Sequence, residues 1–269
     1  INISFMGMDN LGNKAKGLRG KMAKGFLSSC HQVKEELSLM GKKDYCSHPF
    51  EKMVVMGEST VAGGAWLPRM EDRWADVLAL LINRCQEKPV EYHNKGIGAN
   101  SISPRSPGYE ASAKPSALER YHKDVIALKP DLFILCYGLN DMRAGMNVED
   151  FREDMQTIIG DVKKACAPVI VLTTVYHMTA FRSYAPFDEG GVQQTRIYNE
   201  VIRQLAEDND CLLADVWEGE GLADWLIHPD GVHANVVGNI IIANRVFEVL
   251  AQNCSGLTLQ AYAQAENTE

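Results

Sequence analysis

The sequence predicts a three-layer α/β/α sandwich built on a central parallel sheet of about five strands. From about residue 50 onward, short apolar segments of strand length alternate with longer segments in which apolar residues recur at helical spacing. This alternation is typical of βαβ units, in which helices cover both faces of a parallel sheet. The length of 269 residues, with 46% hydrophobic and 23% charged side chains, suits one large α/β domain.

The expected strands are short β-like runs at 52–57, 90–97, 131–138, 168–175 and 211–216. Pro130 and Pro168 stand at the entry of two of these runs, where a preceding helix must stop and a missing N–H is tolerated. Apolar residues spaced by three and four predict helices over 74–85, 151–162, 198–205 and 236–250. Together these segments form five βα units.

Two connections are long and rich in Pro, Gly, Ser and aromatic residues, at 99–118 and 176–191. Ligands of open parallel sheets bind beyond the carboxyl ends of the strands, which is where both connections begin. We therefore expect them to form the walls of a substrate pocket. The alternative is that they are surface loops without a role in binding.

The sequence divides into an N-terminal segment (1–50), a main domain (51–254) and a C-terminal tail (255–269). The N-terminal segment begins with a basic, glycine-rich arm and continues as a predicted amphipathic helix. Its apolar stripe consists of Phe26, Cys30, Val33, Leu37 and Met40. The stripe is expected to pack on the main domain, and a short homodimer seam is the alternative.

Charge and composition exclude several classes of partner. The formal net charge is -8, and the only basic region is residues 1–50, with eight Lys/Arg against four Asp/Glu. An acidic chain repels phosphate backbones, so no nucleic-acid partner is expected. The longest apolar runs are far shorter than the roughly 20 residues that span a bilayer. Seven scattered cysteines without a CxxC pair favour a reducing, cytoplasmic compartment, although export with a removed signal peptide stays open.

Polar residues with catalytic chemistry follow two of the predicted strands. Ser59 comes directly after the first strand and the Gly57 turn, where a serine hydroxyl can project from the edge of the sheet. Asn140 and Asp141 follow the third strand, so a parallel sheet brings them to the same edge. An Asn amide can donate to a developing oxyanion. The alternatives are that Ser59 caps a helix and that Asn140 and Asp141 form a turn.

A carboxylate and an imidazole lie close together just before the last predicted helix. Asp230 precedes His233 by three residues, and a tight turn can place this carboxylate against one imidazole nitrogen. The second nitrogen then accepts the proton of a serine hydroxyl. The alternatives are a turn aspartate and a solvated histidine. His228 is a rival imidazole, but no carboxylate stands three residues before it.

These motifs together resemble the SGNH hydrolases, also called the GDSL family of lipases and esterases, whose fold is flavodoxin-like. Four blocks occur in the family's order over residues 51–250, about three quarters of the chain. They are GES with Ser59, NKGIGAN at 94–100, GLND at 138–141 and DGVH at 230–233. Four short motifs in the correct order are far more specific than any one of them.

The resemblance implies a serine esterase with Ser59 as nucleophile, His233 as general base and Asp230 as the residue that orients the imidazole. It further implies an oxyanion hole made by the Ser59 N–H, a backbone N–H of Gly98 or Ala99, and the Asn140 amide. The mechanism that it implies requires no metal or organic cofactor. The chain departs from the family pattern in two places. Glu58 stands where Asp is usual, and Ala99 occupies the position of a Gly that commonly donates to the oxyanion.

The expected substrate is a small acyl ester, with a short acyl or acetyl group. Trp66, Tyr176 and Arg143 are candidate substrate contacts, alongside Phe181, Tyr184, Phe187, Arg69 and Arg182. The alternative for the aromatic residues is that they anchor the loops. Alternative functions are acyl transfer, thioester or lysophospholipid hydrolysis on the same site, or a ligand-binding module without catalysis. A nucleotide-binding protein is disfavoured because the ESTVAGG loop has no P-loop lysine.

Overall fold

The computed structural model describes residues 41–257. The chain divides into two units between Asp44 and Tyr45, and the second unit contains all the elements described below. The apolar stripe predicted over 26–40 and most of the predicted tail lie outside the described residues. Among residues 41–257, no helix is both long and apolar enough to cross a membrane.

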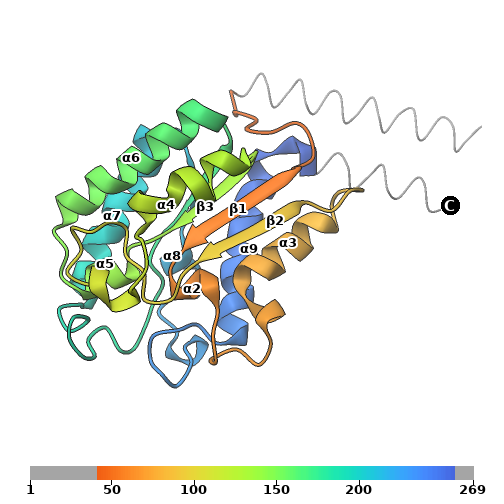
Figure 1. Cartoon of the computed structure of the whole chain (residues 1–269). Helices are drawn as coiled ribbons and strands as arrows, with labels where there is room; N and C mark the ends of the chain where they lie inside the picture. The colour runs from red at the N-terminus through yellow and green to blue at the C-terminus, as the bar shows by residue number, and fades with distance from the viewer. Residues whose placement is uncertain (1–40, 258–269) are drawn as a thin grey trace, which may run out of the picture. The chain divides into compact units, whose positions relative to one another are not determined.

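A five-stranded parallel sheet forms the centre of the fold (Figure 1). The strands lie in the order β2-β1-β3-β4-β5, and all four pairings are parallel. Their bounds are β1 (Lys52–Gly57), β2 (Glu91–Gly96), β3 (Leu132–Cys136), β4 (Val169–Thr173) and β5 (Leu212–Ala214). The predicted parallel sheet of about five strands is confirmed. The first strand has its predicted bounds, and the others are two or three residues shorter than predicted.

Long helices cover both faces of the sheet, as the sandwich prediction requires (Figure 1). One face carries α3 (Trp74–Asn83) and α9 (Val236–Asn253), which pack on each other. The opposite face carries α4 (Ala117–Asp124), α6 (Val148–Cys166) and α7 (Val192–Asp208). Short helices follow three strands: α2 (Ser59–Ala62) after β1, α5 (Leu139–Arg143) after β3 and α8 (Val216–Glu220) after β5.

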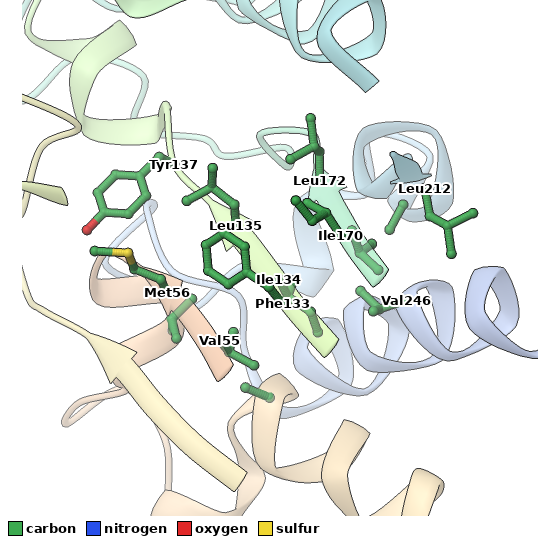
Figure 2. Packing of buried hydrophobic residues seen from close by; sticks show 14 of the residues in the cluster. Val55, Met56, Phe133, Ile134, Leu135, Tyr137, Ile170, Leu172, Leu212 and Val246 are labelled. Carbon is green, nitrogen blue, oxygen red and sulfur yellow. The ribbon is translucent and has the colours of Figure 1, made fainter. Parts of the chain in front are cut away.

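The core consists of the central strands and the inner faces of the helices. Val54, Phe133 and Val171 are fully buried, as expected for parallel strands covered on both faces. Figure 2 shows side chains of β1, β3, β4 and β5 packed together with Val246 of α9. Burial of this kind contributes about 25 cal/mol per Å² of apolar surface.

The packed unit extends beyond the predicted boundaries of the main domain at both ends. Phe50 is 1% exposed and Leu257 is 2% exposed, so both belong to the core. The backbone N–H of Gly256 donates to the carbonyl of Cys46 at 3.0 Å, which joins the two ends. The compact unit that contains the sheet therefore begins at Tyr45 and includes residues 255–257, while the predicted division of the chain into domains stays a prediction.

Helix α4 was not predicted: its first two residues fall within the long connection expected at 99–118, and its other six follow it. A capping box starts this helix: the Ser116 N–H and hydroxyl donate to the Glu119 carboxylate, both at 2.8 Å. The Ser-x-x-Glu pattern is the sequence signal that would have revealed it. The loop at 176–191 contains no helix or strand, as expected.

The strand register brings the ends of three strands to one level. Gly57 at the end of β1 pairs with Gly96 of β2 and with Cys136 of β3. A Cβ atom on Gly57 would lie 2.6 Å from the Cys136 carbonyl oxygen and would collide with the Val61 side chain. Only glycine therefore allows α2 to turn so closely over the sheet, and the residues after β1, β2 and β3 emerge together at its carboxyl edge.

Candidate active site

Ser59 is the first residue of α2, directly after β1 and its turn. Its Oγ lies 2.9 Å from Nε2 of His233, and Nδ1 of His233 lies 2.8 Å from Oδ2 of Asp230. A carboxylate can only accept, so Nδ1 carries the imidazole proton and Nε2 accepts from the serine hydroxyl. The structure thus brings together the three residues that the sequence proposed as a triad, from opposite ends of the domain.

The Asp230 carboxylate organises the loop that leads into α9. Its Oδ1 accepts the backbone N–H groups of Val232 at 2.8 Å and of His233 at 2.9 Å, while Oδ2 faces the imidazole. Partial burial would raise the pKa of Asp230, but the hydrogen bonds and the His233 charge outweigh it and lower this pKa to about 2. The carboxylate is therefore ionised throughout the neutral range.

The environment of His233 favours the neutral imidazole. Burial lowers the pKa of His233, and the charges of Arg143 and His228 lower it further. The hydrogen bond and charge of Asp230 act in the opposite direction. A neutral imidazole whose Nε2 lone pair faces the serine is the form that accepts a proton from a hydroxyl.

His228, the rival imidazole, also lies against Asp230. Its Nδ1 is 3.1 Å from Oδ2 of Asp230 and 3.2 Å from the Asp230 backbone nitrogen. The hydroxyl of Ser59 forms its hydrogen bond with Nε2 of His233 and not with His228. The geometry therefore favours His233 as the partner of the serine. That both histidines meet the same carboxylate was not predicted from the sequence.

The loop of residues 230–234 is held by the segment after β4. The Tyr176 hydroxyl donates to the carbonyl of Val232 at 3.0 Å, and the backbone N–H groups of Thr179 and Ala180 donate to the carbonyl of Gly231 at 2.9 and 2.7 Å. Tyr176 is 5% exposed. Its side chain supports the loop, and the contact with substrate predicted for it stays a prediction.

The backbone N–H groups and the amide predicted to form an oxyanion hole stay a prediction, and their hydrogen bonds show which of them have hydrogens to spare. Within the described part of the chain, the backbone N–H groups of Ser59, Gly98 and Ala99 donate to no other residue. The Asn140 amide donates one hydrogen to the carbonyl of Asn100 at 3.0 Å. Its second hydrogen stays available to donate to an oxyanion. Ala99 has a left-handed φ of 55°, the region that favours glycine and that the family's usual Gly adopts more easily.

Glu58, noted as a departure from the family pattern, connects two of the blocks. Its carboxylate accepts the backbone N–H groups of Gly138, Leu139 and Asn140 at 2.9, 3.0 and 3.1 Å. Burial and the charge of Asp141 raise the pKa of Glu58, while these three hydrogen bonds act to lower it. The carboxylate fixes the position of the Asn140 segment relative to the serine turn.

Asp141 connects the same segment to the loop after β2. Its Oδ1 accepts the backbone N–H of Ile102 at 3.1 Å, and the side chain is fully buried. Burial raises its pKa to about 7, although the Ile102 hydrogen bond opposes this change. The Gly-x-Asn-Asp block thus supplies one candidate oxyanion donor and one structural carboxylate, a division that the sequence did not reveal.

Arg143 and the aromatic residues of the loop after β4 pack against each other. The Arg143 guanidinium donates to Ser183 Oγ at 2.8 Å and to the Phe181 carbonyl at 3.4 Å, and it lies 5.4 Å from the Phe187 ring centre. Burial lowers the pKa of Arg143. Phe187 is buried, whereas Tyr184 is 73% exposed. Phe187 therefore anchors the loop, and a substrate contact by Arg143 stays a prediction.

Trp66, another candidate substrate contact, stacks directly on the imidazole of His233. The ring centres are 3.5 Å apart and the planes differ by 7°. No local pattern in the sequence predicts this contact, since it joins the loop after α2 to the loop before α9.

A hydroxyl, an imidazole and a carboxylate joined in series by hydrogen bonds can carry out nucleophilic acyl chemistry. Together with the parallel sheet covered by helices on both faces, this arrangement is the one expected of hydrolases built on an α/β/α sandwich. The chain belongs to the GDSL-like lipase/acylhydrolase family, whose family model matches residues 55–240. This finding confirms the resemblance and the class of ester hydrolase predicted from the sequence.

Several known proteins are similar to this chain. An acetylxylan esterase from Geobacillus stearothermophilus is 25% identical over 212 residues, which covers 72% of this chain and 90% of that protein. A lipase/acylhydrolase from Enterococcus faecalis has a similar fold, with a TM-score of 0.60 at 20% identity over 75% of this chain and 96% of that one. A carbohydrate acetylesterase from Sinorhizobium meliloti gives a TM-score of 0.61 at 16% identity, over 75% and 99% of the two chains.

Proposed function

We propose that this protein is a serine esterase that hydrolyses short-chain carboxylic esters, and acetyl esters in particular. The observation that carries the proposal is the continuous hydrogen-bonded series from Asp230 through His233 to the Ser59 hydroxyl, at 2.8 and 2.9 Å. These distances lie within the range in which a general base acts on its proton donor. Family membership supports the same chemistry.

The reaction proceeds in two steps through an acyl-enzyme. His233 Nε2 takes the proton of Ser59 as Oγ attacks the ester carbonyl, and the imidazolium then gives this proton to the departing alcohol. In the second step, His233 takes a proton from the water that attacks the acyl-serine. The imidazolium then returns this proton to Ser59 Oγ as the acyl–oxygen bond breaks and the carboxylic acid leaves. Asp230 keeps the imidazole in the correct tautomer and stabilises its positive charge in both steps.

The tetrahedral intermediate carries its negative charge on the former carbonyl oxygen. The N–H of Ser59, the second amide hydrogen of Asn140 and an N–H of Gly98 or Ala99 are the donors proposed for it. Each donor of this type typically contributes about 3–4 kcal/mol to stabilisation of the transition state. Glu58 and Asp141 hold the Asn140 segment in place through backbone hydrogen bonds.

The proposal of an acetyl or other short acyl group draws support from the relatives. The similar proteins named above include an acetylxylan esterase and a carbohydrate acetylesterase. In the segment after β4, Tyr176 and Phe187 are buried and contribute to loop packing. These side chains are therefore committed to the fold rather than to a long acyl chain.

A series of p-nitrophenyl esters from acetate to laurate tests the proposed acyl preference. We expect kcat/KM to be highest for acetate or propionate and to fall about tenfold or more by octanoate, because one misfit methylene group changes binding by about 1–3 kcal/mol. The Ser59→Ala variant measures the background. A maximum at octanoate or laurate would contradict the short-chain proposal while leaving the serine mechanism intact.

A further inference from the structure

The indole of Trp66 covers one face of the imidazole that the proposed mechanism uses as its base. The ring centres are 3.5 Å apart and the planes are within 7° of parallel. Trp66 is partly buried. The groups that act on the His233 imidazole are the Trp66 ring, Asp230 and His228 of its own loop, and the more distant positive charge of Arg143. Among the described residues, Trp66 is the aromatic residue whose ring stacks on His233.

The chain after α2 is built to bring the indole back over the site. Gly63 has a φ of 74°, and its N–H donates to the Ser59 carbonyl at 2.9 Å, which ends α2. The N–H of Leu67 donates to the Gly64 carbonyl at 3.0 Å and closes the next turn. A Cβ atom on Gly64 would lie 2.5 Å from Cη2 of Trp66 and even closer to a second ring atom. Glycine at this position is therefore a condition for the stack.

The stack has two physical consequences for the imidazole. It fixes the plane of the ring, so that Nδ1 stays directed at Asp230 and Nε2 at Ser59. It also removes water from one face, and burial disfavours the charged form of a histidine. An electron-rich indole face stabilises the imidazolium as it forms, which offsets part of this cost.

We propose that Trp66 is a positioning residue of the active site, which sets the orientation and the protonation of His233 by stacking on its imidazole. This inference rests on the proposed function for its catalytic meaning, but the effect on the imidazole itself is independent of any substrate. Trp66 acts through His233, so its loss changes the base and leaves the Ser59 nucleophile in place.

A histidine titration by NMR tests the proposal without turnover. The chain has seven histidines, and the His233→Asn variant identifies the Cε1–H signal of His233 by its absence. Burial is the largest cause of the lowered His233 pKa, so uncovering the ring in Trp66→Ala is expected to raise this pKa by about half a pH unit or more. Trp66→Phe keeps an aromatic face and is expected to stay near the wild type.

Trp225→Ala is the matched control. Trp225 lies on the 3₁₀ helix Asp224–Leu226, is 81% exposed and makes no ring contact with His233. Its substitution is expected to leave the His233 titration unchanged. An unchanged or lowered His233 pKa in folded Trp66→Ala protein would overturn the proposal, whether or not the protein proves to be an esterase.

Kinetics supply a second readout on p-nitrophenyl acetate. The neutral imidazole is the active form, so a higher His233 pKa moves the acid limb of the kcat/KM profile of Trp66→Ala to higher pH. We also expect a fall of about tenfold or more in kcat from the less ordered imidazole, with most activity restored in Trp66→Phe. A loss of kcat with an unmoved acid limb in both variants would indicate a structural role only and would contradict the proposal.

Discussion

Alanine in place of Ser59, of His233 or of both is expected to lower kcat for p-nitrophenyl acetate by nearly the same factor, about 10⁵- to 10⁶-fold. The hydroxyl and the imidazole are joined by a 2.9 Å hydrogen bond and act as one unit in the proposed mechanism. Removing either one leaves only the contribution of substrate binding and of the oxyanion donors, so removing the second has little further effect. Progress curves of the three variants at matched enzyme concentration measure this.

The non-additive pattern distinguishes a serine and a histidine that act as one unit from two residues that act independently. Two independent residues would give a double variant whose loss is the product of the two single losses. Thermal unfolding of each variant controls for misfolding. Both side chains lie at the edge of the sheet rather than in its core, so we expect the unfolding temperature to change little. A single variant that keeps more than about one hundredth of wild-type kcat would contradict the proposed roles.

The substitution Asp230→Asn is expected to lower kcat by about 10⁴-fold with little change in KM. The amide keeps the size of the carboxylate, but its nitrogen donates to His233 Nδ1 and reverses the tautomer. Nε2 then carries a proton and cannot accept one from Ser59. Because the pKa of Asp230 is lowered to about 2, acidification within the working range of an esterase cannot reproduce this effect, and the variant is needed.

The pair formed by His177 and Asp224 provides the control for this substitution. Oδ1 of Asp224 lies 2.7 Å from Nε2 of His177, and this pair makes no contact with Ser59. Asp224→Asn is therefore expected to keep wild-type kcat on the same substrate. If the Asp230→Asn and Asp224→Asn variants showed equal activity, Asp230 would not be the residue that orients the base.

The sequence predicted the parts of the site that depend on strand ends. Ser59 and Asn140 each follow a buried strand, and the carboxyl ends of parallel strands meet at one edge, so their proximity follows from fold class alone. The separation of three residues between Asp230 and His233 likewise suffices to place a carboxylate beside an imidazole. The pairing of Gly57 with both Gly96 and Cys136 provides the register that makes these local predictions hold together.

Other parts of the site depend on tertiary contacts that no local pattern encodes. The Trp66 stack requires a turn through two glycines and a partner from the far end of the domain. Glu58 was noted only as standing where Asp is usual, whereas its reach to the three amides at the start of α5 is set by the packing of β1 on β3. The burial of Tyr176 and Phe187 within the loop after β4 likewise depends on tertiary packing.

Labelling with a fluorophosphonate probe tests the central claim most directly, because the probe reacts only with a serine that an adjacent base has activated. Intact-mass spectrometry of the wild-type protein should show a single adduct, and peptide mapping should place it on Ser59. The adduct should be absent from Ser59→Ala and should form far more slowly with His233→Ala. A folded wild-type protein that takes no adduct, or an adduct that persists in Ser59→Ala, would contradict the assignment of Ser59 as the nucleophile.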